Sequence, residues 1–327
     1  MKPAFSVIFL TTLIGIGQGL FLALFTVESY AAFDLLPKQP DEFYAIGSAL
    51  ALVFLTGGLI ASFFHLGRPE RAWRAATQWR TSWLSREVIV LPAFMGTVFL
   101  YGIAHWLDFN PVLAQLPTGA PVNVTAILGT VGTVLAFTLF VCTGMIYACL
   151  RFLREWHTPL TVANYILLGG ASGFVLAALF ASLAAPDLVR FFAGWALVIT
   201  ITGLVSRGAS LIRNARLKPK STLQSAIGVK HPRIVQKTQG AMGGSFNTRD
   251  FFHGKSAAGM RTARWLFLVA VFALPLAMLA AVMMETWERA PVLVVAFAVQ
   301  YAGLLVERWF FFAQASHPQN LYYQSVA

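Results

Sequence analysis

The residues best suited to chemistry in this chain are a histidine, a glutamate and the arginines near them. His65 ends one long apolar run and Glu87 begins the next, and the segment between them is rich in arginine and tryptophan. Ionisable side chains at the edge of a membrane core are costly to place there, which makes them candidates for a functional site. Neutral imidazole offers one hydrogen-bond donor and one acceptor, and its pKa lies near physiological pH. This pair could therefore bind a membrane-dissolved molecule and move protons to or from it.

Each of these candidates also has a purely structural explanation. His65 could bond a neighbouring backbone group at the membrane surface, and Glu87 could cap a helix N-terminus, where a carboxylate is favoured. The functional interpretation gains from Arg86 and Arg71, which with His65 and Glu87 would form a proton path. The turn at Pro69 limits where Arg71 can reach.

The composition predicts that nearly all of the chain lies in a membrane. Of its 327 residues, 57% are hydrophobic and only 11% are charged, and the mean hydropathy is +0.69. An ordinary soluble domain has about 25% charged residues. The apolar residues form blocks longer than the roughly 18 that indicate a spanning helix. We predict an all-α polytopic protein, a single integral membrane domain over residues 1–327, with eight spans at 4–29, 43–66, 87–107, 122–149, 159–184, 188–207, 263–285 and 290–313.

The loops between these spans alternate in charge. The second loop (67–86) and the sixth (208–262) are strongly basic, whereas the first (30–42) is mainly acidic. Because cytoplasmic loops carry an excess of Lys and Arg, this alternation puts the even-numbered loops and both termini in the cytoplasm. We therefore expect a multi-pass protein of the bacterial inner membrane, with the segment from His65 to Glu87 at its cytoplasmic face. The net charge of +11 fits that topology and does not indicate nucleic-acid binding, because no recognition motif surrounds it.

The sixth loop, 208–262, is the only sizeable segment expected outside the membrane. It is too short and too polar to build its own core. A loop of this length is usually functional or disordered. Its aromatic residues favour an ordered element that docks on a partner; they are Phe246, Phe251, Phe252 and His253.

Haem and metal ligation are disfavoured for this chain. Only Cys142 and Cys149 are present, whereas an iron–sulfur cluster or a zinc site needs about four ligands. A haem held by two histidines requires a pair at similar depth. His105 falls at the opposite face from His65, and the other histidines fall in or beside cytoplasmic loops or the tail.

Several polar residues within the spans have ordinary structural explanations. Glu307 and Arg308, late in the eighth span, could belong to a structural ion-pair network or to a functional site. Gln18 and Gln300 are expected to bond across helices. Three tryptophans fit an interfacial aromatic belt, although they could also line a flat pocket; they are Trp73, Trp79 and Trp83.

With these residues in view, the chain resembles the membrane-anchor subunits of the DMSO reductase family of molybdoenzymes. The resemblance rests on the string His-Leu-Gly-Arg-Pro-Glu-Arg-Ala at 65–72, on Leu-Ser-Arg-Glu at 84–87, and on Glu307-Arg308, and it covers essentially the whole chain. It implies a subunit that binds quinone (ubiquinone or menaquinone) and holds no haem or metal. It also implies two partners, a ferredoxin-like four-cluster iron–sulfur subunit and a molybdopterin catalytic subunit.

The same resemblance assigns the quinone site to His65, Arg71 and Glu87. Arg86 departs from the family pattern, which has an uncharged residue there, and an added cation would favour the ionised carboxylate of Glu87. Anchors of exported enzymes present this motif to the periplasm, whereas here the charge rule puts it in the cytoplasm. The chain therefore resembles most the anchors of cytoplasmic sulfite-oxidising complexes.

This resemblance implies electron flow from sulfite, through molybdenum and iron–sulfur clusters in the partners, to membrane quinone. The reverse flow, from quinol to an S- or N-oxide, would use the same residues and stays open. A purely structural anchor is a third alternative. A secondary transporter is less favoured, because such proteins place charges or broken helices near the bilayer midplane.

Overall fold

The computed structural model describes residues 1–115, 117, 119, 121–218, 221–235, 237, 238, 251–285 and 289–322. Within these residues, eight helices are long and apolar enough to cross a membrane, which confirms the predicted all-α bundle. Seven are single helices: α1 (Phe5–Ala32), α2 (Asp41–Phe63), α3 (Trp83–Trp106), α4 (Val124–Ala148), α5 (Pro159–Ala184), α6 (Val189–Ala215) and α11 (Arg289–Ala313). The remaining span is a continuous run of α9 (Ala257–Phe267), η4 (Leu268–Ala273) and α10 (Leu274–Met283).

Polar residues fix where several of these helices begin. A side-chain oxygen accepts a hydrogen bond from a backbone N–H of the first turn at four helices, through Ser82 for α3, Asn123 for α4, Thr158 for α5 and Ser256 for α9. Each oxygen satisfies an amide that has no partner within its helix. Because Ser82 caps α3, the interpretation of Glu87 as a helix cap is not needed.

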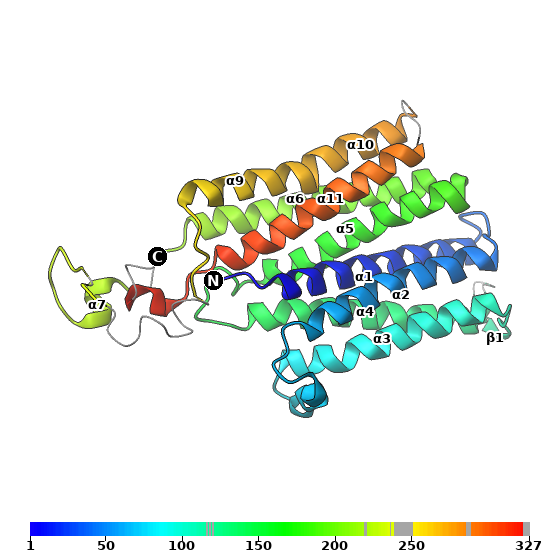
Figure 1. Cartoon of the computed structure of the whole chain (residues 1–327). Coiled ribbons are helices and arrows are strands. Elements are labelled where there is room, and N and C mark those ends of the chain that lie inside the picture. The colour runs from blue at the N-terminus through cyan, green and yellow to red at the C-terminus, as the bar shows by residue number, and fades with distance from the viewer. Residues whose placement is uncertain are drawn as a thin grey trace.

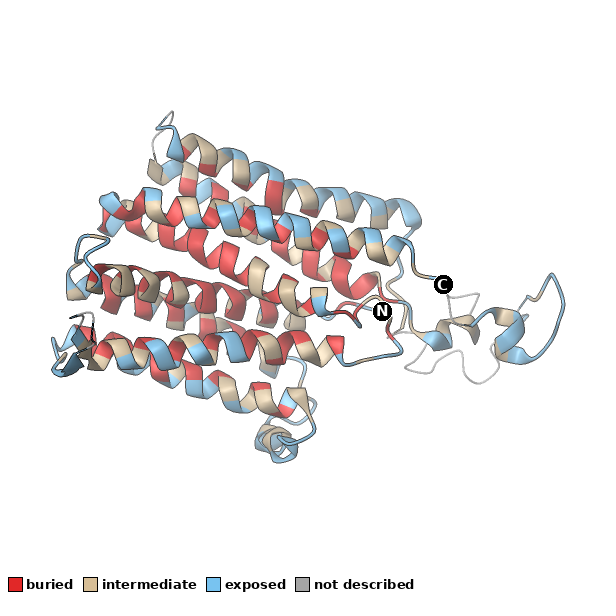
Figure 2. Ribbon diagram, turned by 180° about the vertical axis from the view of Figure 1, so that it is seen from behind, coloured by how far each residue is buried: buried red, intermediate tan, exposed pale blue. Residues whose placement is uncertain are grey.

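Helices α1 and α5 form the centre of the bundle. In their most apolar stretches 72% and 61% of the residues are buried, against 33–39% in the other spans. Figure 2 shows the buried residues concentrated in the middle helices, with exposed residues on the outer ones. The two central helices contact each other through glycine: a Cβ atom on Gly173 would lie 2.2 Å from the carbonyl carbon of Gly19. The small residues in these spans therefore permit close backbone approach, as lipid-embedded helices require.

The seventh span contains a π-helical turn, η4, immediately before Pro275. Proline has no N–H to donate to the carbonyl four residues earlier, which belongs to Val271. The side chain of Gln300 in α11 donates to that carbonyl at 3.4 Å. Gln300 thus makes the cross-helix bond that the sequence predicted, to a carbonyl that cannot receive a hydrogen bond from Pro275. Gln18 also bonds across helices, by donating to the carbonyl of Ala136 in α4 at 2.8 Å.

Shorter elements lie at the two ends of the bundle (Figure 1). One end carries η1 (Pro69–Gln78), α7 (Leu223–Ile227), η5 (Pro318–Tyr322) and the N-terminus. The other end carries η2 (Pro186–Leu188) and an antiparallel hairpin of β1 (Val112–Gln115) and β2 (Pro121–Asn123), in which Val112 pairs with Asn123. This hairpin was not predicted, because the third loop has no strand pattern long enough to stand out.

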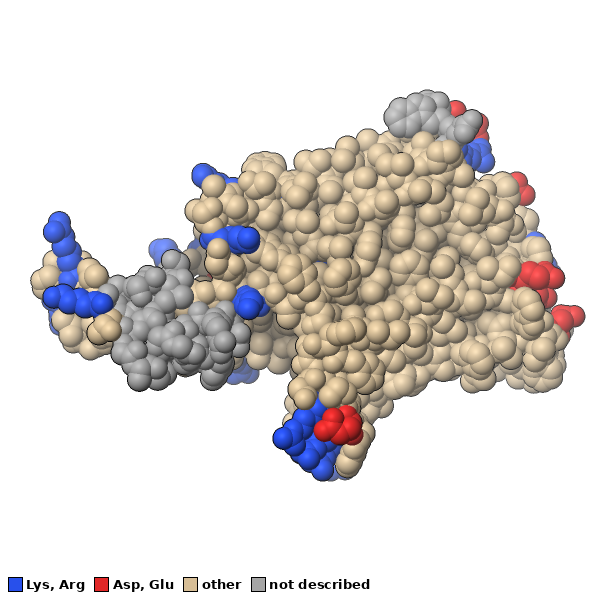
Figure 3. Space-filling model, in the orientation of Figure 1, with Lys and Arg blue, Asp and Glu red and all other residues tan. Residues whose placement is uncertain are grey.

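The two ends also differ in charge (Figure 3). Lysine and arginine gather at the end with the N-terminus and η1, and acidic side chains predominate at the other. We call these the basic end and the acidic end. They correspond to the even-numbered and odd-numbered loops of the sequence. The assignment of the basic end to the cytoplasm stays a prediction.

The connection between the sixth and seventh spans is shorter than the predicted loop over 208–262. Helix α6 continues to Ala215 and α9 begins at Ala257. The extra turns of α6 are polar, but they pack: the Arg213 guanidinium donates to the carbonyls of Arg154 and His157 at 3.0 and 3.1 Å. Hydropathy alone ends the span too early, because these polar residues continue the helix by bonding to a neighbouring loop.

Candidate functional site

Glu87 lies in the second turn of α3 and points into the bundle. It is only 7% exposed, and its carboxylate accepts a hydrogen bond from the hydroxyl of Thr143 in α4. Together with Gln18 and Tyr165 it lines a small internal cavity, with about 10 Å³ of space for the centre of a water-sized molecule. That is close to the minimum for a single water. The carboxylate is therefore an interior group that a water molecule can reach, with no room beside it for a larger ligand.

His65 and Arg71 occupy a different environment, on the connection between α2 and α3. His65 follows the last turn of α2 and is exposed, although partial burial of its imidazole lowers the pKa of His65 below its ordinary value. Arg71 lies in η1 with its Nε 3.9 Å from the Glu70 carboxylate, and both side chains are at least half exposed. The hydrogen bonds and ion pairs found among the described residues do not connect either of them to the Glu87 carboxylate. The structure thus leaves His65 and Arg71 exposed on the connection between α2 and α3, whereas Glu87 is buried inside the bundle.

Arg86 links the connection between α2 and α3 to the first turn of α3. Its Nε donates to the carbonyl of Trp79 at 2.9 Å and its Nη2 to the carbonyl of Arg80 at 2.8 Å. The guanidinium also lies over the ring of Trp83, 4.2 Å from the centroid. From the sequence this cation was expected to act on the carboxylate of Glu87. In the structure, Nε and Nη2 of this cation bond the backbone of the connection, and its effect on Glu87 stays a prediction.

The tryptophans of this connection lie on its surface. Trp73 and Trp79 are exposed, and each has an arginine over its ring, Arg74 at 5.5 Å and Arg80 at 5.4 Å. Exposed indole and guanidinium groups in alternation are typical of a segment at a membrane–water interface. This arrangement fits the aromatic belt that the sequence suggested.

A second group of buried charges lies between α6 and α11. Arg207 Nε is 2.7 Å from Glu307 Oε1, and Arg308 Nε is 3.4 Å from Glu307 Oε2. All three residues are at most 3% exposed. The sequence pointed to Glu307 and Arg308, but Arg207 was missed because it was taken as the end of a span. The available signal was an arginine that follows the uncharged residues 191–206 of that span.

Tyr165 connects these charges with the interior of the bundle near Glu87. The Arg308 guanidinium lies 3.9 Å from the centroid of the Tyr165 ring, and Tyr165 lines the same small cavity as Glu87. A continuous band of buried polar groups therefore crosses the half of the bundle nearest the basic end, from α3 through α5 to α11 and α6. The band thus contains a buried group of paired charges at α6 and α11 and the separate carboxylate of Glu87 at its α3 edge.

Comparison with known proteins agrees with this layout. The family described as DMSO reductase anchor subunit (DmsC) matches residues 1–323. The chain belongs to this family. It is also 58% identical over 327 residues to a sulfite dehydrogenase subunit of Allochromatium vinosum, covering 100% of both chains. The resemblance drawn from the residues at 65–72, 84–87 and 307–308 is thereby confirmed.

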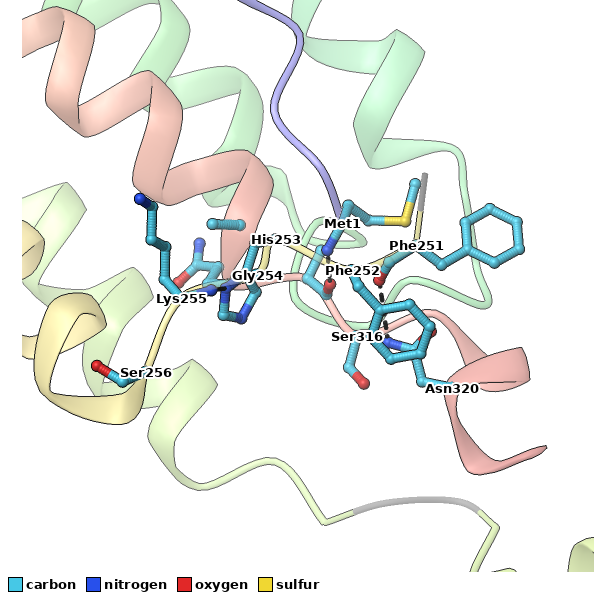
Figure 4. Close-up of a pocket in the computed structure, with 12 residues that line it drawn as sticks. Met1, Phe251, Phe252, His253, Gly254, Lys255, Ser256, Ser316 and Asn320 are labelled. Carbon is cyan, nitrogen blue, oxygen red and sulfur yellow. Dashed lines mark hydrogen bonds between the residues drawn. The ribbon is translucent and has the colours of Figure 1, made fainter. Parts of the chain in front are cut away.

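The basic end of this family member also holds an open cavity of about 550 Å³ (Figure 4). It lies where Met1, the segment 251–256 and the end of α11 meet. Phe251 stacks on His317 with ring centroids 3.8 Å apart, and Asn320 donates to the Phe251 carbonyl at 3.2 Å. The aromatic residues expected to dock on a partner thus include one that contacts the anchor's own C-terminal segment. Phe246 lies outside the described residues.

Proposed function

We propose that this chain is the membrane-anchor and quinone-reactive subunit of a molybdopterin and iron–sulfur complex that oxidises sulfite in the cytoplasm. The observation that carries the proposal is the full-length identity of 58% to a sulfite dehydrogenase subunit. In this proposal electrons pass from a molybdopterin catalytic subunit, through a ferredoxin-like four-cluster iron–sulfur subunit, to ubiquinone or menaquinone. The host membrane is the bacterial inner membrane, with the basic end in the cytoplasm.

The basic end is the proposed docking surface for the iron–sulfur subunit. The connection between α2 and α3 projects from the bundle with its arginines exposed, as Figure 3 shows at the lower edge. Complementary charge steers association and fixes the orientation of a partner. An acidic partner bound there would bring its clusters beside His65.

The quinone headgroup is proposed to lie against His65 and Arg71, which are accessible on that connection. When bound, quinone accepts two electrons and two protons. His65 can donate a hydrogen bond from its imidazole, and the Arg71 guanidinium can donate to a carbonyl oxygen. Glu87 has no room for a ring beside it, so its role is to hold a proton and pass it through a water molecule in the small cavity. Thr143 fixes the orientation of that carboxylate.

Substitution of Glu87 tests this assignment. Glu87→Gln keeps the shape and the bond to Thr143 but cannot carry the proton. Sulfite-dependent quinone reduction should fall by about 100-fold, within the range that general acid–base groups contribute. Complex assembly and dye-linked sulfite oxidation should stay at the level of the unmodified protein.

The matched control is Asp187→Asn, which alters an exposed carboxylate at the acidic end. It should change none of the three measurements. A joint loss of assembly, dye-linked oxidation and quinone reduction in Glu87→Gln would show that Glu87 is structural. Quinol-driven reduction of an S-oxide, without any sulfite activity, would instead reverse the proposed direction of electron flow.

A further inference from the structure

The small cavity beside Glu87 is lined by polar side chains from four helices, α1, α3, α4 and α5. These side chains are Thr11, Gln18, Glu87, Thr143 and Tyr165, and each of the five residues is at most 8% exposed. The cavity has about 10 Å³ of space for the centre of a water-sized molecule. It can therefore hold one small molecule and no more.

Gln18 has a fixed orientation at this cavity. Its side-chain nitrogen donates to the Ala136 carbonyl at 2.8 Å. Because two carbonyl oxygens cannot bond each other, this contact determines which end of the Gln18 amide carries the nitrogen. The Gln18 side-chain oxygen, Oε1, has no hydrogen-bond partner among the described residues, yet it is not one of the buried atoms that are closed off from open space. Oε1 therefore faces the cavity that Gln18 lines.

Glu87 presents a second acceptor to the same space. One of its carboxylate oxygens, Oε1, accepts a hydrogen bond from the Thr143 hydroxyl. The other, Oε2, has no such partner among the described residues and is likewise not closed off from open space. Two acceptor oxygens from different helices thus face one cavity of about the size of a water molecule.

The other polar groups of the lining give no donor to these two oxygens. The Thr143 hydroxyl already donates to Glu87 Oε1. The Thr11 hydroxyl donates to the Val7 carbonyl at 2.9 Å. The Tyr165 hydroxyl is closed off from open space, so Tyr165 lines the cavity with its ring. An occupant must therefore bring its own donors within a very small volume, and water meets both conditions.

We propose that Gln18 is a positioning residue for proton transfer at Glu87, because it holds one water molecule against the carboxylate. When Glu87 is ionised, the water donates one hydrogen to Glu87 Oε2 and the other to Gln18 Oε1. When Glu87 is protonated, the water accepts from Glu87 and still donates to Gln18. Gln18 keeps the water in place in both states and itself neither gains nor loses a proton. The positioning role rests on the proposed function of Glu87, whereas the water site does not.

Gln300 provides a matched control for Gln18. It is also a buried glutamine, 1% exposed, and its side-chain nitrogen also donates to a carbonyl of another helix, that of Val271. Its oxygen, however, is closed off from open space, and Gln300 is not part of the cavity lining. Replacement of either glutamine removes a bond between helices, but only replacement of Gln18 removes an acceptor from the cavity.

A structure of the full-length chain at a resolution that shows ordered water tests the site itself. We expect one peak within hydrogen-bond distance of Glu87 Oε2 and Gln18 Oε1, in the unmodified chain and in Gln300→Met. The peak should be absent from Gln18→Met, because methionine is close to glutamine in length but has no acceptor oxygen. An empty cavity in the unmodified chain would overturn the proposal. A peak that appears only when sodium is added would also overturn it, since the occupant would then be a cation.

Kinetics of the assembled complex test the positioning role. In Gln18→Met, the kcat of sulfite-dependent quinone reduction should fall about tenfold with the KM for quinone unchanged, a smaller loss than the roughly 100-fold expected when the acid itself is removed. The ratio of the rates in ordinary and heavy water should rise, because proton transfer becomes slower relative to the other steps. Gln300→Met should change neither quantity, and thermal unfolding of both variants reports whether each retains the fold.

The outcomes separate this role from the proposed function. Normal quinone reduction in Glu87→Gln would overturn the role of Glu87 and, with it, the positioning role of Gln18. Slow reduction in Glu87→Gln together with normal reduction in Gln18→Met would overturn the positioning role alone. Equal losses of kcat in Gln18→Met and Gln300→Met, with an unchanged isotope ratio, would show that Gln18 is only a contact between helices.

Discussion

Ionisable side chains lie inside both ends of the bundle, and the two groups differ in how far they are buried. Arg207, Glu307 and Arg308 are sealed between helices and are at most 3% exposed. Glu28, Asp41 and His105 line a cavity of about 650 Å³. Both groups form ion pairs within the chain, but Asp41 in the open group is 44% exposed. The sealed group therefore links α6 to α11, whereas the open group borders a cavity that opens to the surface.

A third set of charges, at the protein surface, allows the stability contributions of a buried and an exposed ion-pair set to be compared. Glu285 bridges two arginines as Glu307 does, with Arg190 Nη2 at 2.9 Å and a further ion pair to Arg289. The Glu285 side chain is 49% exposed. The same set of one carboxylate and two guanidinium groups thus occurs once in the interior and once at the surface. The two sets differ most in burial, so their contributions to stability can be compared on that basis.

The most decisive prediction concerns the orientation of the two ends. A cysteine introduced at Thr77 in η1 and one at Leu35, both on the surface, should label oppositely with a membrane-impermeant thiol reagent. If the basic end is cytoplasmic, the Thr77→Cys variant reacts only in inverted vesicles and the Leu35→Cys variant only in intact cells. The background is Cys149→Ser, because Cys149 is exposed whereas Cys142 is buried. The opposite labelling would place the proposed partners outside the cytoplasm.

The largest expected effect on stability is that of Glu307→Gln. Removal of the carboxylate leaves two buried guanidinium groups without an anion, which should cost about 3–5 kcal/mol. Glu285→Gln should cost at most about 1 kcal/mol, as is usual for exposed ion pairs. Denaturant unfolding of both variants in the same detergent measures the two values. Equal losses would show that burial does not distinguish the two sites.

A smaller effect is expected at the contact between the central helices. Gly173→Ala should destabilise the bundle by about 1–3 kcal/mol, because the added methyl group overlaps the backbone of Gly19. Gly96→Ala is the control, since a Cβ atom there meets nothing within 4 Å and alanine favours a helix. Thermal unfolding should therefore show a lower midpoint for the first variant and an unchanged or higher midpoint for the second. An unchanged midpoint in Gly173→Ala would mean that α1 and α5 separate without loss of stability.

The smallest effect is predicted for Asp41→Asn at the open group. The Asp41 side chain is 44% exposed, so its pair with His105 is screened by solvent. We expect a loss of at most about 1 kcal/mol, well below the loss for Glu307→Gln. Unfolding of the two variants side by side gives the comparison. A loss as large as that of Glu307→Gln would mean that the open group is as essential to the fold as the sealed one.

The spans were predictable from sequence because their length and composition are set by the bilayer. All eight were found, and residues 307–308 were correctly considered as members of an ion-pair network. Contacts between helices were harder to foresee. Arg207 and Glu307 lie on different helices, and their proximity depends on helix rotation and on packing between helices that have no strong polar face.

The same limit applies to the acidic end and to the candidate quinone site. Glu28, Asp41 and His105 come from three helices, and the sequence indicated only that His105 lies opposite His65. At the basic end, the sequence identified His65, Arg71, Arg86 and Glu87 but could not reveal that Glu87 faces inward. That direction follows from the packing of α3 against α4, where Thr143 meets the carboxylate.

The two carbonyl bonds made by Arg86 have a mechanical consequence. Arg86 grips the external connection through Trp79 and Arg80, and the next residue along the helix is the interior acid. The connection is therefore attached to α3 at the residue directly before Glu87. A partner bound to the connection would therefore contact a segment that is hydrogen-bonded to the residue next to Glu87.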